Sequence, residues 1–272
     1  MEKNLSIFSL ERQNDLRIEF NKIRNDLSTK VRVDSKQYTI EAYLDVCVKF
    51  WPYRCGAISV KDYLNDIGVD TNEITEKSDI LLYLELIINL LYWAPIHEAS
   101  GGSAFSHKMF FGETDIEKES ERIIKNIEYV LDECCNMVVQ EECAETNKYY
   151  IRMKNAQAEV VAATIPELEE LVLSYLDMRK EDDVEYKKSI LYALYSYMEP
   201  RRDEYKKLAC SAISEEFFAS MNKLGIRHNT KTQVKLNEDE QIEVYDKLYF
   251  LALYVLETVK VNGYKDELKD LR

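Results

Sequence analysis

Glycine and proline are scarce in this chain, which has seven glycines and four prolines among 272 residues. Both residues interrupt helices, and nearly all of them fall where a run of helically spaced apolar residues starts or stops. This distribution is typical of an all-helical protein. We therefore predict an all-α, mainly helical fold, built as a multi-helix bundle.

Histidine is rare in this chain, and the cysteines are not spaced as metal ligands. The three histidines and six cysteines form no C-x-x-C pair and no zinc-type spacing. His97, Glu98 and His107 fall in one predicted loop, but their spacing matches no helical ligand pattern, and polar loop contacts are the better interpretation. We expect no metal and no cofactor. The Met1 start lacks a charged-then-apolar leader, so the expected localisation is cytoplasmic.

No apolar run is long enough for a membrane span. The most apolar window, Ile80–Trp93, is interrupted by Glu85 and Asn89 and closed by Pro95, whereas a bilayer requires about 20 apolar residues. It is therefore predicted to be a buried core helix. Glu85 and Asn89 lie one turn apart and would face a ligand pocket, an internal basic contact or solvent.

Positive charge is the scarcer sign, with 36 basic against 50 acidic side chains and a net charge of −14. This balance repels a phosphate backbone at long range. Residues Ser59–Val69 resemble the first half of a helix-turn-helix, but the following NEITEKSD has three acids and one base where a DNA reader needs donors. We expect no DNA binding there, and a three-helix packing unit explains the same pattern.

Helix boundaries follow from apolar spacing and capping signals. Capping boxes are predicted to start at Ser59, Thr114, Thr164, Asp182 and Asn237. Gly68, Gly225 and Gly263 are placed to close helices. The predicted helices cover about 9–29, 38–50, 59–67, 73–93, 114–139, 156–179, 183–208, 213–224 and 238–261.

One segment departs from helical spacing. Apolar and polar residues alternate in Tyr149–Lys154, which predicts a small β-hairpin near 140–154. The long loop 94–114 separates an N-terminal helical unit, 1–95, from a C-terminal unit, 114–272, unless the two form one continuous domain.

Tyrosine is abundant, with 19 residues. Several lie at helical spacing in Ser189–Met198 and Lys247–Leu256, where few lysine or arginine residues accompany them. A surface that stacks nucleotides would also need basic side chains, so a tyrosine-rich helix interface is the better interpretation.

Against the acidic background, the stretch Asn222–Lys235 carries four bases and no acid: Lys223, Arg227, Lys231 and Lys235. If Gly225 closes the preceding helix, Ile226 can contact Met221. The basic residues next to this closure then complement the negative end of the helix dipole. The alternative is that they attract phosphate.

The segment Ser211–Lys260, with FFASMNKLGIRHNT followed by EQIEVYDKLYFLALYVLETV, resembles the C-terminal end of bacterial abortive-infection proteins and the wider HEPN-like helical group. The upstream SILYALYSYMEPRR shares the likeness more weakly. The resemblance implies a metal-independent ribonuclease in which an arginine stabilises phosphate charge and a histidine moves protons, here Arg227 and His228. In that group several residues separate the two, whereas here they are adjacent.

Two hypotheses follow. The first is a phage-defence protein that binds or cleaves RNA, with catalysis assigned to Arg227 and His228. Its RNA-binding residues would be Lys223, Asn229, Lys231, Lys235, Arg201 and Arg202. The second is a non-catalytic helical module that binds another protein or a second copy of itself.

Overall fold

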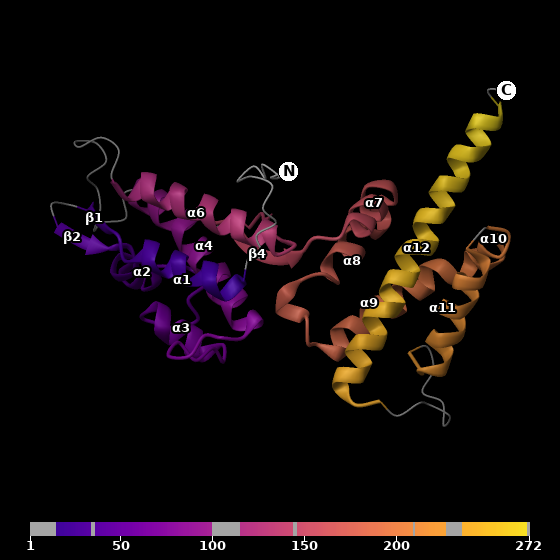
Figure 1. Ribbon diagram of the computed structural model, residues 1–272, viewed down its shortest axis with the longest axis horizontal. Coiled ribbons are helices and arrows are strands. Elements are labelled where there is room, and N and C mark those ends of the chain that lie inside the picture. Colours follow the sequence, from indigo (N-terminus) through magenta and orange to yellow (C-terminus); the bar gives the residue numbers. More distant parts are fainter. Residues whose placement is uncertain are drawn as a thin grey trace, which may run out of the picture. The chain divides into compact units, whose positions relative to one another are not determined.

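The structure, a computed structural model, describes residues 15–33, 36–99, 115–143, 146–208, 210–226 and 236–270 (Figure 1). It is mainly helical, with two small antiparallel two-stranded sheets in the described ranges. The predicted helical bundle is confirmed. None of the described helices combines the length and the hydropathy that a bilayer crossing requires.

The chain divides into two compact units, residues 1–152 (unit 1) and 153–272 (unit 2). This division differs from the predicted seam at 94–114. The helices on either side of that loop pack on each other within unit 1, because both present apolar faces to one core.

Unit 1 is built around one long buried helix, α4, against which α1, α2 and α6 pack. Ile87, Leu90 and Leu91 of α4 are fully buried, as expected for a core helix. α4 continues through Pro95 to Ala99, beyond its predicted end at 93. The elements of this part of the chain are α1 (Leu16–Leu27), β1 (Lys30–Val33), β2 (Lys36–Thr39), α2 (Ile40–Val48), α3 (Val60–Asp66), α4 (Lys77–Ala99), α6 (Asp115–Glu133), β3 (Asn136–Glu141) and β4 (Lys148–Met153).

Two hairpins interrupt the helices. The predicted hairpin near 140–154 is present as β3 and β4. The hairpin of β1 and β2, with Val31 opposite Tyr38, was not predicted. Its strands have four residues each, too few for a period-2 pattern to stand out between two helices. Val31 is buried, and β1 contacts α6, so tertiary packing stabilises this hairpin.

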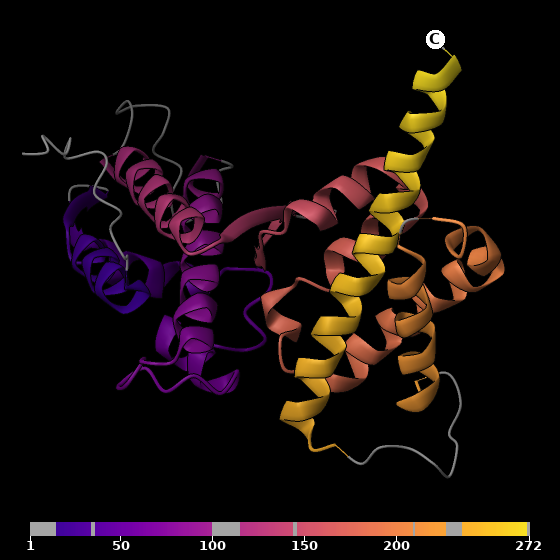
Figure 2. The ribbon, with the colours of Figure 1, turned by 45° about the vertical axis from the view of Figure 1, so that its right-hand side comes forward.

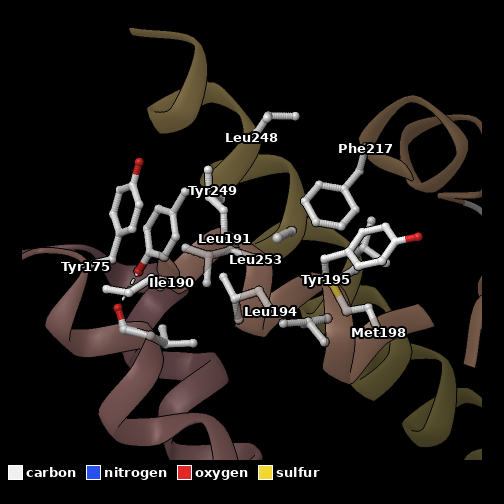
Figure 3. Close-up of a cluster of buried hydrophobic side chains, with 14 of the residues drawn as sticks. Tyr175, Ile190, Leu191, Leu194, Tyr195, Met198, Phe217, Leu248, Tyr249 and Leu253 are labelled. Carbon is white, nitrogen blue, oxygen red and sulfur yellow. Dashed lines mark hydrogen bonds between the residues drawn. The ribbon is translucent and has the colours of Figure 1, made fainter. Parts of the chain in front are cut away.

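Unit 2 is a bundle in which α12 lies against α7, α9 and α11 (Figures 1 and 2). Its core is rich in aromatic rings, with Tyr195, Phe217 and Tyr249 almost fully buried (Figure 3). The predicted tyrosine-rich helix interface is confirmed for Tyr195 and Tyr249, whereas Tyr192 and Tyr254 of the same predicted runs are exposed. The elements are α7 (Ala156–Thr164), η1 (Pro166–Leu168), α8 (Glu169–Ser174), η2 (Met178–Lys180), α9 (Val184–Met198), η3 (Glu199–Arg201), α10 (Arg202–Tyr205), α11 (Ser211–Lys223) and α12 (Glu238–Asp270).

Two predicted long helices of unit 2 are broken near prolines. The helix predicted over 156–179 ends at Thr164, and Ile165 before Pro166 leaves the helical region with φ −128° and ψ 80°. A proline ring disfavours helical geometry in the residue before it. The helix predicted over 183–208 likewise gives way to a 3₁₀ turn at Glu199–Arg201, around Pro200.

Two of the predicted N-caps, Ser59 and Asn237, are confirmed by hydrogen bonds to the first turn of the helix that follows. Ser59 accepts from the Asp62 N–H at 3.0 Å, and Asn237 and Glu240 exchange reciprocal hydrogen bonds of 2.9 Å. The predicted cap at Asp182 is wrong by one residue, because Asp183 accepts from the Tyr186 N–H. The predicted cap at Thr164 is also wrong, since its hydroxyl donates back to the Val161 carbonyl. Thr114 lies outside the described residues.

Two of the three predicted glycine closures are confirmed. Gly68 and Gly225 have φ of 89° and 66°, a left-handed geometry that glycine adopts without strain. Gly263 does not close a helix, because α12 runs on to Asp270.

Candidate functional site

The predicted basic site is described in part. Lys223 is the last residue of α11 and is exposed. Arg227, His228, Asn229, Lys231 and Lys235 lie outside the described residues. Arg201 and Arg202 lie where η3 passes into α10.

Backbone hydrogen bonds close the end of α11 next to Lys223. The Ile226 N–H donates to the Met221 carbonyl at 3.2 Å, and the Gly225 N–H donates to the Asn222 carbonyl at 3.1 Å. Ile226 is buried, as the predicted closure requires. The Ser220 carbonyl accepts from the Leu224 N–H. These carbonyls therefore have backbone partners, and neighbouring bases would add only long-range charge at this end.

Arg201 and Arg202 each stack on an aromatic ring. The Arg201 guanidinium carbon lies 4.4 Å from the ring centroid of Tyr197, and that of Arg202 lies 4.8 Å from the ring centroid of Phe218. A hydrogen bond with Tyr197 raises the pKa of Arg201. Such stacking orients a guanidinium. We call Tyr197, Arg201, Arg202 and Phe218 the arginine–aromatic cluster.

This cluster connects to the helix that carries Lys223. Phe218 belongs to α11, and the rings of Tyr205 and Phe218 stack with centroids 6.4 Å apart. Lys223 follows Phe218 by five residues, a rise of about 7.5 Å along the helix axis. α11 thus carries both Lys223 and the ring on which Arg202 stacks, and Lys223 lies about 140° around the helix from Phe218.

Burial raises the pKa of Tyr205 to about 12. An unfolded tyrosine has a pKa of about 10, so the unfolded chain loses this proton first as the pH rises. The contribution of protonated Tyr205 to the free energy of unfolding is complete below about pH 10 and is lost as the pH approaches 12. We expect the melting temperature to fall between these values, and to fall less in Tyr205→Phe. Equal losses in wild type and variant, measured by thermal circular dichroism, would contradict this assignment.

An internal ionic pair in unit 2 was missed from the sequence. Lys187 Nζ lies 2.6 Å from Asp246 Oδ1, and its side chain is 5% exposed. Tyr175 donates to the same carboxylate oxygen at 2.8 Å, and its ring stacks on Tyr249 with centroids 4.0 Å apart (Figure 3). Burial, followed by the Asp246 charge, raises the pKa of Tyr175. The available signal was Lys187 itself, a base in helical register with buried Ile190, Leu191 and Leu194.

Glu85 and Asn89 have structural partners, and the three alternatives left open by the sequence did not include this one. The Asn89 side chain accepts from the Tyr149 N–H at 2.9 Å and donates to the Tyr149 carbonyl at 2.6 Å. Glu85 Oε2 accepts from the Ile151 N–H at 2.8 Å. Two side chains of α4 thus act as hydrogen-bonding partners for strand β4.

Unit 1 also contains a pocket of about 410 Å³ where α1 and α4 begin. Arg17 donates to the Thr75 carbonyl at its wall, and burial raises the pKa of the Cys134 thiol. The lining residues are Asp15, Leu16, Arg17, Thr75, Lys77, Ile80 and Cys134. Within the described ranges, no group of three or more histidine, cysteine, aspartate or glutamate side chains is placed to hold a metal ion. His107 lies outside these ranges.

Comparison with known proteins gave no match: no family model fits the chain, and no curated protein or solved structure is detectably similar to it.

Proposed function

We propose that unit 2 binds RNA through a basic surface made of the arginine–aromatic cluster, Lys223 and the bases of 227–235. The observation that carries the proposal is the stacking of Arg201 and Arg202 on rings, one of which belongs to α11. α11 thereby carries both Lys223 and the ring on which Arg202 stacks.

The chemistry of the cluster suits a single-stranded nucleic acid. Guanidinium edges bind phosphate oxygens in a bidentate manner, and guanidinium planes stack on unpaired bases. Arg201 is exposed, so the guanidinium donors that do not bond Tyr197 can reach solvent. Buried Arg202 Nε has no hydrogen-bond partner among the described residues, although its guanidinium stacks on Phe218.

RNA cleavage is a separate part of the proposal and rests on the resemblance to HEPN-like proteins. Arg227 would stabilise phosphate charge and His228 would transfer the proton, without a metal. Because the two residues are adjacent, both reach one phosphate only from an irregular loop.

The binding test is a gel-shift titration with single-stranded RNA at several salt concentrations. Six bases, each contacting one phosphate, give a salt slope of about −4, from roughly −0.7 per contact. Arg201→Ala and Lys231→Ala should each weaken binding to all sequences alike and flatten the slope by about 0.7. Lys247→Ala is the matched control, because Lys247 is an exposed base on α12 paired with Glu243.

His228→Ala separates binding from catalysis: cleavage should be lost while RNA retention persists. Wild-type protein that neither retains nor cleaves RNA at low salt would refute the proposal and leave the helical interaction module.

A further inference from the structure

One face of α12 carries a row of exposed apolar side chains, Phe250, Tyr254, Val261 and Tyr264, which we call the α12 stripe. They are 40%, 43%, 57% and 49% exposed. Their separations of four, seven and three residues follow the heptad spacing that keeps side chains on one helix face. Another face of α12 packs into the core of unit 2.

The α12 stripe continues onto a projecting part of the helix. In both ribbon views the C-terminal end of α12 extends past the other helices of unit 2 (Figures 1 and 2). Single exposed apolar side chains are common on soluble proteins, but several on one helix face indicate an interaction surface.

The charge of the stripe favours a second copy of this chain as the occupant. Between Phe250 and Tyr264 the sequence has one acid, Glu257, and one base, Lys260, so the stripe is neutral in a chain of net charge −14. A polyanion would require a positive surface. Two copies of an acidic chain repel each other least where their facing surfaces carry no net charge.

Glu257 and Lys260 are also self-complementary. If two α12 helices run antiparallel with Tyr254 of one beside Tyr264 of the other, Glu257 of each copy comes next to Lys260 of the other. A two-fold axis makes this favourable contact twice. Parallel pairing would instead place like charges together. The Lys260 ammonium lies 5.4 Å from the ring centroid of Tyr264, which places it beside the stripe.

We propose that this protein forms an antiparallel homodimer through the α12 stripe. The face from Phe250 to Tyr264 is about 21 Å long, and its area is small against the roughly 800 Å² that each partner buries in a standard interface. The dimer is therefore weak, with a dissociation constant in the micromolar range. The proposal is independent of RNA binding.

Sedimentation equilibrium over a range of protein concentrations tests it. The wild-type mass should rise from 32.0 kDa towards twice that value. Glu257→Lys and Lys260→Glu should each weaken dimerisation about tenfold or more, because each turns both cross-copy pairs into like-charge pairs. Tyr129→Asp, at an exposed apolar residue of unit 1, is the control and should leave dimerisation unchanged.

The decisive experiment mixes the two charge variants. An equimolar mixture of Glu257→Lys and Lys260→Glu restores opposite charges across the interface, so a heterodimer should form although each variant alone dissociates. A charge effect within one chain cannot be rescued in this way. A wild type that stays at 32.0 kDa up to several hundred micromolar, or a mixture that remains monomeric, would overturn the proposal. Unchanged far-ultraviolet circular dichroism shows that the variants remain folded.

Discussion

Asp246→Ala is expected to lower the free energy of unfolding by about 2–4 kcal/mol, whereas Lys187→Met should cost about 1 kcal/mol or less. The asymmetry follows from burial. Losing Asp246 leaves the Lys187 ammonium, 5% exposed, without its carboxylate, but losing Lys187 leaves Asp246, 40% exposed, in contact with water and with Tyr175. Urea titration followed by far-ultraviolet circular dichroism measures both values.

The double variant Lys187→Met, Asp246→Leu is the control for this pair. It removes both charges and should recover most of the stability lost in Asp246→Ala, since an apolar replacement of an ion pair is often neutral. Equal losses in the two single variants would contradict the view that an isolated buried ammonium dominates the cost.

Asn89→Leu is expected to destabilise unit 1 by about 2–4 kcal/mol, because it leaves the N–H and the carbonyl of Tyr149 without their side-chain partner. Leucine has the same number and branching of side-chain heavy atoms as asparagine, so no cavity forms and the loss reports mainly the hydrogen bonds. Trp51 and Trp93 are the two tryptophans of the chain, and both lie in unit 1. Tryptophan fluorescence during urea titration therefore follows this unit.

Glu85→Gln is the matched conservative change on the same helix. Its amide oxygen can still accept from the Ile151 N–H, so the expected loss is below about 1 kcal/mol. If Asn89→Leu is as mild as Glu85→Gln, these side chains do not stabilise the docking of β4 on α4.

Some features of the candidate site could be predicted from the sequence, and others could not. The closure of α11 by Gly225 and Ile226 was predictable because its hydrogen bonds span only five residues. The ring beneath Arg202 was not, because Phe218 approaches this arginine only after α10 packs on α11. Glu85 and Asn89 were recognised as polar residues in a core helix, but their partner strand lies some sixty residues away.

By itself, the sequence determined the helical class, the starts of α3 and α12 at Ser59 and Asn237, and the ends marked by Gly68 and Gly225. These features depend on side-chain spacing and on hydrogen bonds within one or two turns, which neighbouring residues specify. Only the tertiary structure decided the β1–β2 hairpin, the division after Arg152 and the pairing of Lys187 with Asp246. Each of these depends on apolar faces and charges distant in the chain, whose burial is set when the helices pack together.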